Sequence, residues 1–211
     1  FRDGGYYNNW DFSEILLKKY LSVAKSSGID FVELGFRFFK NDGFKGPYAF
    51  MKDSFIERID IPEGIKISIM INGKDLVEDG KLVFSRIEQL VPKKKSASKV
   101  DLIRIATTFD NFFVIYPVFS FLKKAGYHTA VNIMQIQAEN INLEQFFRYA
   151  KEKDLDVIYI ADSFGSFSSQ EIKNIFLEIK KYWSGNLGFH AHDNKRLALS
   201  NSLTALNMGV T

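Results

Sequence analysis

The sequence predicts a (β/α)₈ barrel, and these 211 residues supply all of it except the eighth strand and helix. Six short apolar runs, rich in β-branched residues, begin near residues 31, 65, 100, 129, 157 and 187, and each is expected to form a buried strand. Their spacing is close to the ~30 residues of a strand and helix unit. A further strand is expected to end at Phe1-Arg2-Asp3. Because a complete barrel takes ~250 residues, one strand and one helix are missing from the count.

The expected strands cover residues 31–35, 65–71, 100–106, 129–136, 157–161 and 187–191. Between them, apolar residues three and four apart predict helices. Ser13 and Ser168 or Ser169 are suitable N-caps, and Gly28 and Gly126 stand where a left-handed C-cap would end a helix. The Phe-rich segment 109–121 is expected to lie in the core or at a subunit interface. An open, doubly wound sheet would fit the same rhythm, and only the motifs distinguish the two folds.

The composition excludes several classes of protein. It is 46% hydrophobic and 25% charged, which is ordinary for a globular domain. Cysteine is absent, so a metal site must use nitrogen and oxygen ligands. The net charge is +3, and the Lys and Arg residues are spread along the chain except at Lys93-Lys94-Lys95. We interpret this triplet as a solvated loop and not as a nucleic-acid patch. No apolar run approaches the ~18 residues of a membrane span and no signal peptide is recognisable, so a cytoplasmic location is expected.

Polar residues cluster at the carboxyl ends of the expected strands. In a barrel these ends form the active-site face, where residues from distant parts of the chain meet. The residues concerned are Arg2, Asp3, Glu33, Arg37, Asn72, Arg104, Asn132, Gln135, Asp162, Ser163, His190, His192, Asp193 and Asn194. His128 instead precedes its strand, at the opposite edge, and is expected at the surface.

The sequence His190-Ala191-His192 is a candidate metal site. Residues two apart on a strand point to the same side, so both imidazoles can reach one ion. Asp3 is the expected carboxylate, because a barrel places its first strand close to its seventh. Two imidazoles and one carboxylate, with open positions for substrate oxygens, suit a divalent cation that acts as a Lewis acid. Taken alone, His190 and His192 could simply be polar residues at a strand end, and Asp3 could be a turn residue. The occurrence of all three in one sequence favours a metal site.

These motifs resemble the metal-dependent aldolase and acyl-lyase superfamily, the DRE-TIM metallolyases, which includes 4-hydroxy-2-oxovalerate aldolase, hydroxymethylglutaryl-CoA lyase and isopropylmalate synthase. Four motifs carry the resemblance, in the family's order: Phe-Arg-Asp-Gly-Gly from residue 1, Val-Glu-Leu-Gly-Phe from 32, Ala-Asp-Ser-Phe-Gly from 161 and His-Ala-His-Asp-Asn from 190. The run Arg-Asp-Gly-Gly-Tyr-Tyr-Asn-Asn-Trp from residue 2 and Phe-Lys-Gly-Pro from 44 are similar to the 4-hydroxy-2-oxovalerate aldolase-like branch.

The resemblance implies a lyase that cleaves or forms a carbon–carbon bond next to a 2-oxo acid, with an aldehyde as the other substrate. It implies that Asp3, His190 and His192 bind Mg²⁺ or Mn²⁺ and that Arg2 stabilises the enolate oxygen. Glu33 is expected to orient Arg2 or to touch the water shell of the metal, unless it is a core carboxylate paired with an arginine. Residues 1–211 would then be the aldolase catalytic domain, a fragment of a longer protein.

Two departures from the family pattern leave alternatives open. The aldolases carry a His three residues after the metal Asp, as the base for the substrate hydroxyl, and here that position is Tyr6. Tyr6 or Tyr7 could act instead through a lowered pKa or a water. The synthases and the acyl-CoA lyase take another ligand from after the eighth strand, beyond Thr211. An acetyl-CoA-dependent Claisen-type synthase and a non-catalytic scaffold barrel therefore remain alternatives. An open seam should also make the chain aggregate, pair with another chain, as in a homo-oligomer, or depend on residues outside this sequence.

Overall fold

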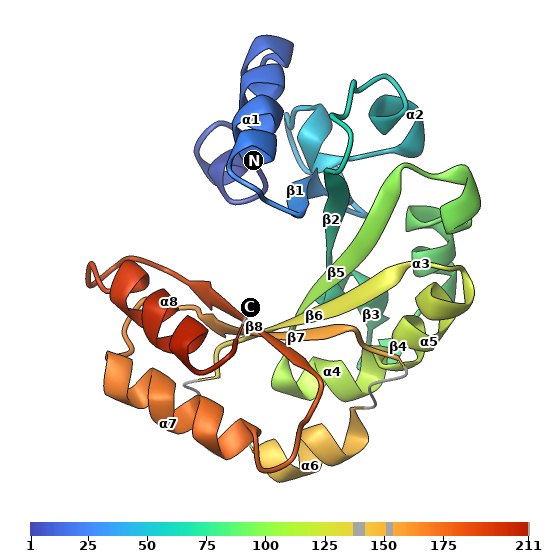
Figure 1. Cartoon of the computed structure of the whole chain (residues 1–211). Helices are drawn as coiled ribbons and strands as arrows, with labels where there is room; N and C mark the ends of the chain where they lie inside the picture. Colours follow the sequence, from blue (N-terminus) through green and yellow to red (C-terminus); the bar gives the residue numbers. More distant parts are fainter. Residues whose placement is uncertain (137–141, 151–153, 211) are drawn as a thin grey trace.

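The computed structural model describes residues 1–136, 142–150 and 154–210. One parallel sheet contains, in spatial order, β1 (Phe31–Phe36), β2 (Lys66–Asn72), β5 (Val100–Thr108), β6 (His128–Met134), β7 (Val157–Asp162) and β8 (Asn186–Ala191). This order follows the chain without reversal, so the sheet lacks the switch point of a doubly wound fold. The sheet curls into an open half-barrel with helices on its outer side (Figure 1), which confirms the prediction of a truncated barrel.

The helices that follow the N-terminal segment and the strands are α1 (Glu14–Ser26), α2 (Asp53–Ile56), α3 (Phe84–Leu90), α4 (Phe109–Ile115), α5 (Pro117–Lys124), α6 (Leu143–Tyr149), α7 (Ser169–Ile179) and α8 (Ala198–Asn207). A short hairpin of β3 (Val77–Glu78) and β4 (Lys81–Leu82) follows β2. In the described part of the chain, no helix is long and apolar enough to cross a membrane.

The predicted helix caps are confirmed. The Ser13 side chain accepts a hydrogen bond from the backbone N–H of Leu16, and Ser168 forms a reciprocal capping box with Glu171. Gly28 and Gly126 have φ values of 70° and 93°, the left-handed conformation that ends a helix. The Phe-rich segment is helical as expected, but it divides into α4 and α5, with Pro117 as the first residue of α5.

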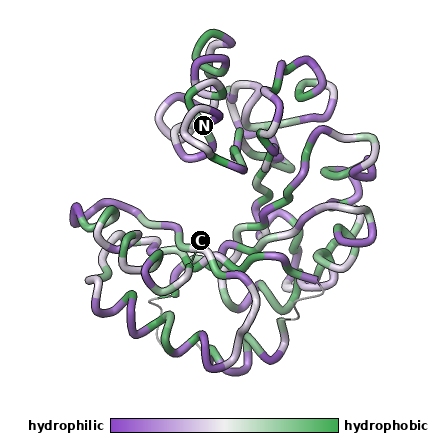
Figure 2. Tube along the Cα trace, viewed as in Figure 1, coloured by the Kyte–Doolittle hydropathy of each residue, from purple (hydrophilic) through white to green (hydrophobic). Residues whose placement is uncertain are grey.

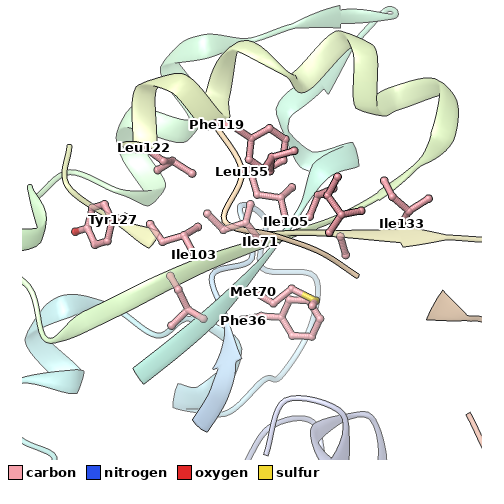
Figure 3. Packing of buried hydrophobic residues seen from close by; sticks show 14 of the residues in the cluster. Phe36, Met70, Ile71, Ile103, Ile105, Phe119, Leu122, Tyr127, Ile133 and Leu155 are labelled. Carbon is pink, nitrogen blue, oxygen red and sulfur yellow. The ribbon is translucent and has the colours of Figure 1, made fainter. Parts of the chain in front are cut away.

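Two residue sets alternate along each strand because successive side chains point to opposite faces of the sheet. One set packs outward: Ile71, Ile103 and Ile105 meet helix residues such as Phe119 and Leu122 (Figure 3). Figure 2 shows the same division along the trace, with alternating hydrophilic and hydrophobic residues in the outer helices. The other set points into the half-barrel and comprises Ser68, Met70, Asn72, Arg104, Ala106, Asn132, Met134, Tyr159, Ala161, Ser163, Gly188, His190 and His192.

Two strand predictions were wrong in extent. Residues 1–3 do not form a regular strand, although the Arg2 N–H donates a 3.4 Å hydrogen bond to the Glu33 carbonyl as a strand neighbour would. A helical turn begins at Gly4, so the segment is too short to extend this ladder. The strand expected to reach residue 136 ends at Met134, because Gln135 has a φ of 58° and leaves the extended conformation.

Candidate active site

The structure brings Asp3, His190 and His192 together at the open seam of the half-barrel. The potential ligand atoms of the three residues all lie within 4.8 Å of one another. The His190 Nε2 atom is 3.4 Å from the Asp3 Oδ2 atom, and the two imidazole rings have centroids 4.8 Å apart. The N-terminal segment therefore meets the end of β8, as the barrel geometry predicts.

The surroundings of both imidazoles suit metal binding. The His192 Nδ1 atom is 2.8 Å from the carbonyl oxygen of Asp162, which can only accept, so the neutral ring carries its hydrogen on Nδ1 and offers the Nε2 lone pair to a metal. Burial lowers the pKa of His190 to about 4, against the opposing charge of Asp3. A neutral imidazole is the form that coordinates metals. This set of two nitrogens and one carboxylate fits a divalent cation.

The Arg2 guanidinium is held beside this cluster by two carboxylates. Its Nε donates to Glu33 Oε1 at 2.8 Å, and its Nη1 donates to Asp3 Oδ1. The backbone carbonyl of Arg2 accepts a hydrogen bond of 2.9 Å from the indole of Trp10. Arg2 is therefore buried and fixed at both its backbone and its side chain.

Glu33 joins two arginines inside the half-barrel. Its Oε2 lies 3.0 Å from Arg104 Nε, while its Oε1 binds Arg2. The Arg104 guanidinium in turn lies over the Tyr159 ring, 4.7 Å from its centroid. Glu33 thus combines two of the expected arrangements, because it orients Arg2 and also forms an internal ion pair.

A small residue at position 188 leaves space for this arrangement. A Cβ atom added to Gly188 would fall 2.3 Å from the Tyr159 ring, closer than any packed carbon contact. Gly188 on β8 therefore allows Tyr159 on β7 to lie across the interior and support Arg104. Gly188 and His190 are two residues apart on β8, so they lie on the same face of the strand.

Tyr6 lines the pocket, but its electrostatics differ from the expectation. Desolvation raises the pKa of the Tyr6 hydroxyl above its usual value, although the Arg2 charge opposes this. This direction runs against the first of the two routes considered for Tyr6, a lowered pKa, and the second route, through a water, stays a prediction. Tyr7 is 95% exposed and does not line the pocket.

A pocket of about 390 Å³ opens beside the three candidate ligands. It is lined by Arg2, Asp3, Tyr6, Phe36, Met70, Asn72, Lys74, Ala106, Asn132, Met134, Gln135, Ala161, Ser163, His190 and His192. Lys74 is the charged member that sequence reasoning missed. Its only signal is its position two residues after the end of β2, in the 3-10 turn Gly73–Leu76.

Several polar residues predicted at this face have structural roles instead. Arg37 is buried on the other side of β1, where it pairs with Asp53 at 3.1 Å and donates to two backbone carbonyls. The Asp162 carboxylate accepts hydrogen bonds from the N–H groups of the turn after β7, and Asp193 accepts one from the N–H of Ala198 at the start of α8. His128 lies at the opposite edge of the sheet, as predicted, with its side chain 55% exposed.

Known proteins with similar sequences include a 4-hydroxy-2-oxovalerate aldolase from Geobacillus genomosp. 3, which is 26% identical over 214 residues. The alignment covers 100% of this chain and 60% of that protein. An oxaloacetate decarboxylase from Mycobacterium tuberculosis is 18% identical, with 99% of this chain and 59% of that protein covered. The chain thus spans about three fifths of the length of these curated relatives.

Solved structures are similar over nearly the whole chain. The N-terminal domain of a Bacteroides vulgatus protein described as an aldolase is 30% identical with a TM-score of 0.86, covering 99% of this chain and 68% of that one. The HMG-CoA lyase from Bacillus subtilis shares the fold at 15% identity with a TM-score of 0.65, covering 95% of this chain and 69% of that one. The family model described as HMGL-like matches residues 64–211. This match covers more than half of the sequence, and the chain belongs to the HMGL-like family.

Proposed function

We propose that this chain is the catalytic barrel domain of a divalent-metal-dependent carbon–carbon lyase that acts through the enolate of a 2-oxo acid. The observation that supports the proposal most directly is the convergence of Asp3, His190, His192 and Arg2 on one pocket. A cation-binding triad beside a fixed guanidinium suits a reaction in which negative charge develops on an oxygen atom.

Asp3, His190 and His192 would hold Mn²⁺ or Mg²⁺, which leaves coordination positions for oxygen ligands. The bound cation would supply Lewis acidity toward the oxygens of the 2-oxo acid. Asp3 can serve two partners at once, since Oδ1 meets Arg2 while Oδ2 faces His190.

The proposed role of Arg2 is to stabilise the enolate. In aldol cleavage the bond between C3 and C4 of a 4-hydroxy-2-oxo acid breaks, and its electron pair becomes the enolate of the 2-oxo fragment. The C4 hydroxyl loses a proton and becomes the carbonyl of the aldehyde, and uptake of one proton at C3 of the enolate then gives the free 2-oxo acid. A planar, buried guanidinium already oriented by Glu33 can hydrogen-bond the enolate oxygen without reorganising. Tyr6, with its raised pKa, stays protonated at neutral pH and can donate a hydrogen bond at the pocket.

The named activities of the relatives support an enolate. Aldol cleavage of 4-hydroxy-2-oxovalerate and decarboxylation of oxaloacetate both leave an electron pair on the carbon next to a 2-oxo group. The two reactions differ in the group that departs. The common requirement is stabilisation of the same anion, which is the task proposed for the cation and Arg2.

The test is exchange of the pyruvate methyl protons with D₂O, followed by mass spectrometry. We expect exchange that needs added Mn²⁺ or Mg²⁺ and stops with a chelator. His190→Ala and His192→Ala should slow it by about 100-fold or more. His128→Ala, at the opposite edge of the sheet, is the matched control and should exchange normally. Exchange without metal, or equal loss in all three variants, would contradict the proposal, and no exchange in any form would favour a non-catalytic scaffold.

A further inference from the structure

The pocket has a wall that the reaction proposed above does not use. It consists of three carboxamide side chains, Asn72, Asn132 and Gln135, together with the ammonium group of Lys74, all lining the pocket that contains the candidate metal ligands. Asn72 and Lys74 come from the end of β2 and the turn after it, and Asn132 and Gln135 from the end of β6. We call these four residues the polar wall.

Asn132 has a buried hydrogen-bonding atom without a partner. The residue is 3% exposed, and its Oδ1 makes no hydrogen bond with any described residue. A buried polar atom left unpaired is costly, so such atoms normally meet a partner. Asn132 faces the pocket, and a bound molecule can supply that partner. A hydroxyl group suits it because a hydroxyl both donates and accepts, and therefore fits either orientation of the amide.

Gln135 is held at the pocket by an uncommon backbone conformation. Its φ of 58° is left-handed, which is unusual for a residue other than glycine. The Ser163 hydroxyl fixes this conformation by accepting a hydrogen bond of 2.9 Å from the Gln135 N–H. Strained backbone of this kind concentrates at functional sites, where it aims a side chain. Here it places a third carboxamide in the lining of the pocket that Asn72 and Asn132 also line.

Lys74 is an exposed cation at the rim of this pocket. Arg2, the other strong cation of the pocket lining, is already neutralised by Asp3 and Glu33. Lys74 forms no salt bridge with any acidic residue that the structure describes. Its charge also acts on the carboxylates of Asp75 and Asp42, but neither forms a salt bridge with it. A lysine ammonium in the lining of a pocket attracts an anionic group of the ligand.

From the polar wall we infer that the aldehyde half of the substrate carries at least one hydroxyl group and a terminal anionic group, either a phosphate or a carboxylate. The inference rests on the proposed function, and it names the substrate class. In the condensation direction, C3 of the enolate bonds to the aldehyde carbon and the aldehyde oxygen takes up a proton. The remote end of the aldehyde then meets the carboxamides and Lys74. The corresponding end of 4-hydroxy-2-oxovalerate is a methyl group, which has no use for these partners.

Aldol condensation of pyruvate with a panel of aldehydes tests this specificity. The panel contains glyceraldehyde 3-phosphate, succinic semialdehyde, glyceraldehyde and propanal, which separate phosphate, carboxylate, hydroxyl and apolar ends. We expect kcat/KM for the better of the two anionic aldehydes to exceed that for glyceraldehyde by about tenfold or more, and glyceraldehyde to exceed propanal severalfold. Comparison of the first two aldehydes identifies which anion the site accepts.

Two variants test which residues of the polar wall cause the preference for anionic and hydroxylated aldehydes. Lys74→Gln should lower kcat/KM for the preferred anionic aldehyde about tenfold more than for glyceraldehyde, and Asn132→Ala should reduce the ratio of glyceraldehyde to propanal. Lys19→Gln, an exposed lysine on α1 outside the pocket, is the control and should leave every ratio unchanged. Calorimetric titration with glycerate 3-phosphate and with succinate gives a readout without turnover, and the affinity for the preferred anion should fall in Lys74→Gln but not in Lys19→Gln.

The outcomes separate this inference from the proposed function. Pyruvate exchange with equal or better use of propanal would overturn the inference and leave the lyase proposal standing. Equal loss for all four aldehydes in Lys74→Gln, with slower pyruvate exchange, would assign Lys74 to the pyruvate carboxylate and also overturn it. Absence of exchange would reject the lyase proposal, and the titration would still decide whether the polar wall binds an anion.

Discussion

Replacement of Glu33 by Gln tests the central ion pair of the half-barrel. The Gln side chain has the same shape but no charge, and its NH₂ group cannot accept a hydrogen bond from an arginine. The change therefore leaves Arg2 and Arg104 with one shared acceptor atom where they had two. The side chains of Arg2, Glu33 and Arg104 are only 9%, 17% and 11% exposed, so water cannot readily replace the lost carboxylate.

The expected cost follows from this burial. Removing one partner of a buried ion pair costs about 3–5 kcal/mol, and the lower end applies because Gln keeps one acceptor and Glu33 is not fully enclosed. A loss of about 3 kcal/mol in a domain of this size lowers the thermal midpoint by roughly 6–12 °C. Pyruvate exchange should also slow, since Arg2 and Arg104 then compete for one acceptor atom and the Arg2 guanidinium is oriented less firmly.

The assay is thermal and urea denaturation of Glu33→Gln beside Glu57→Gln. Glu57 pairs with Lys93 in an exposed ion pair, so the control removes the same charge where water can replace it. We expect only a small shift of the midpoint for Glu57→Gln. If both variants shift the midpoint equally, the internal pair does not stabilise the fold and this reasoning is refuted.

Three further predictions concern the same region. Arg2→Lys should reduce the rate of pyruvate exchange by about 100-fold while the Kd for Mn²⁺ changes little, since a point charge replaces a planar fork; equal losses would reject the enolate role. Mn²⁺ at 100 times its Kd should raise the free energy of unfolding by about 2.7 kcal/mol, an effect reversed by chelator and absent in Asp3→Asn; a gain retained in that variant would place the ion elsewhere. Gly188→Ala should destabilise the fold by about 1–3 kcal/mol in urea titration, because its Cβ would meet the Tyr159 ring. An unchanged midpoint would mean that the ring moves freely.

Local patterns in the sequence determined the elements of the fold. Strand spacing, serine caps and C-cap glycines are local properties of the chain, and the structure agrees with them at Ser13, Ser168, Gly28 and Gly126. The pairing of His190 with His192 was equally predictable, because the twofold repeat of a strand places alternate residues on one face.

Only the tertiary structure decided which face of the sheet the side chains occupy after the bulge in β1. In β1 the pairing with β2 shifts between Glu33 and Gly35, so Leu34 is an extra residue and the alternation changes phase. Glu33, before the shift, and Phe36, after it, therefore both face the interior, and Arg37, predicted at the active face, faces Asp53 on the outside. The meeting of Asp3 with His190 was predicted from the barrel fold, but the 3.4 Å separation of their side chains depends on how far the sheet curls. Sequence spacing reports local periodicity, whereas bulges, curvature and loop paths such as that of Lys74 arise from packing between distant segments.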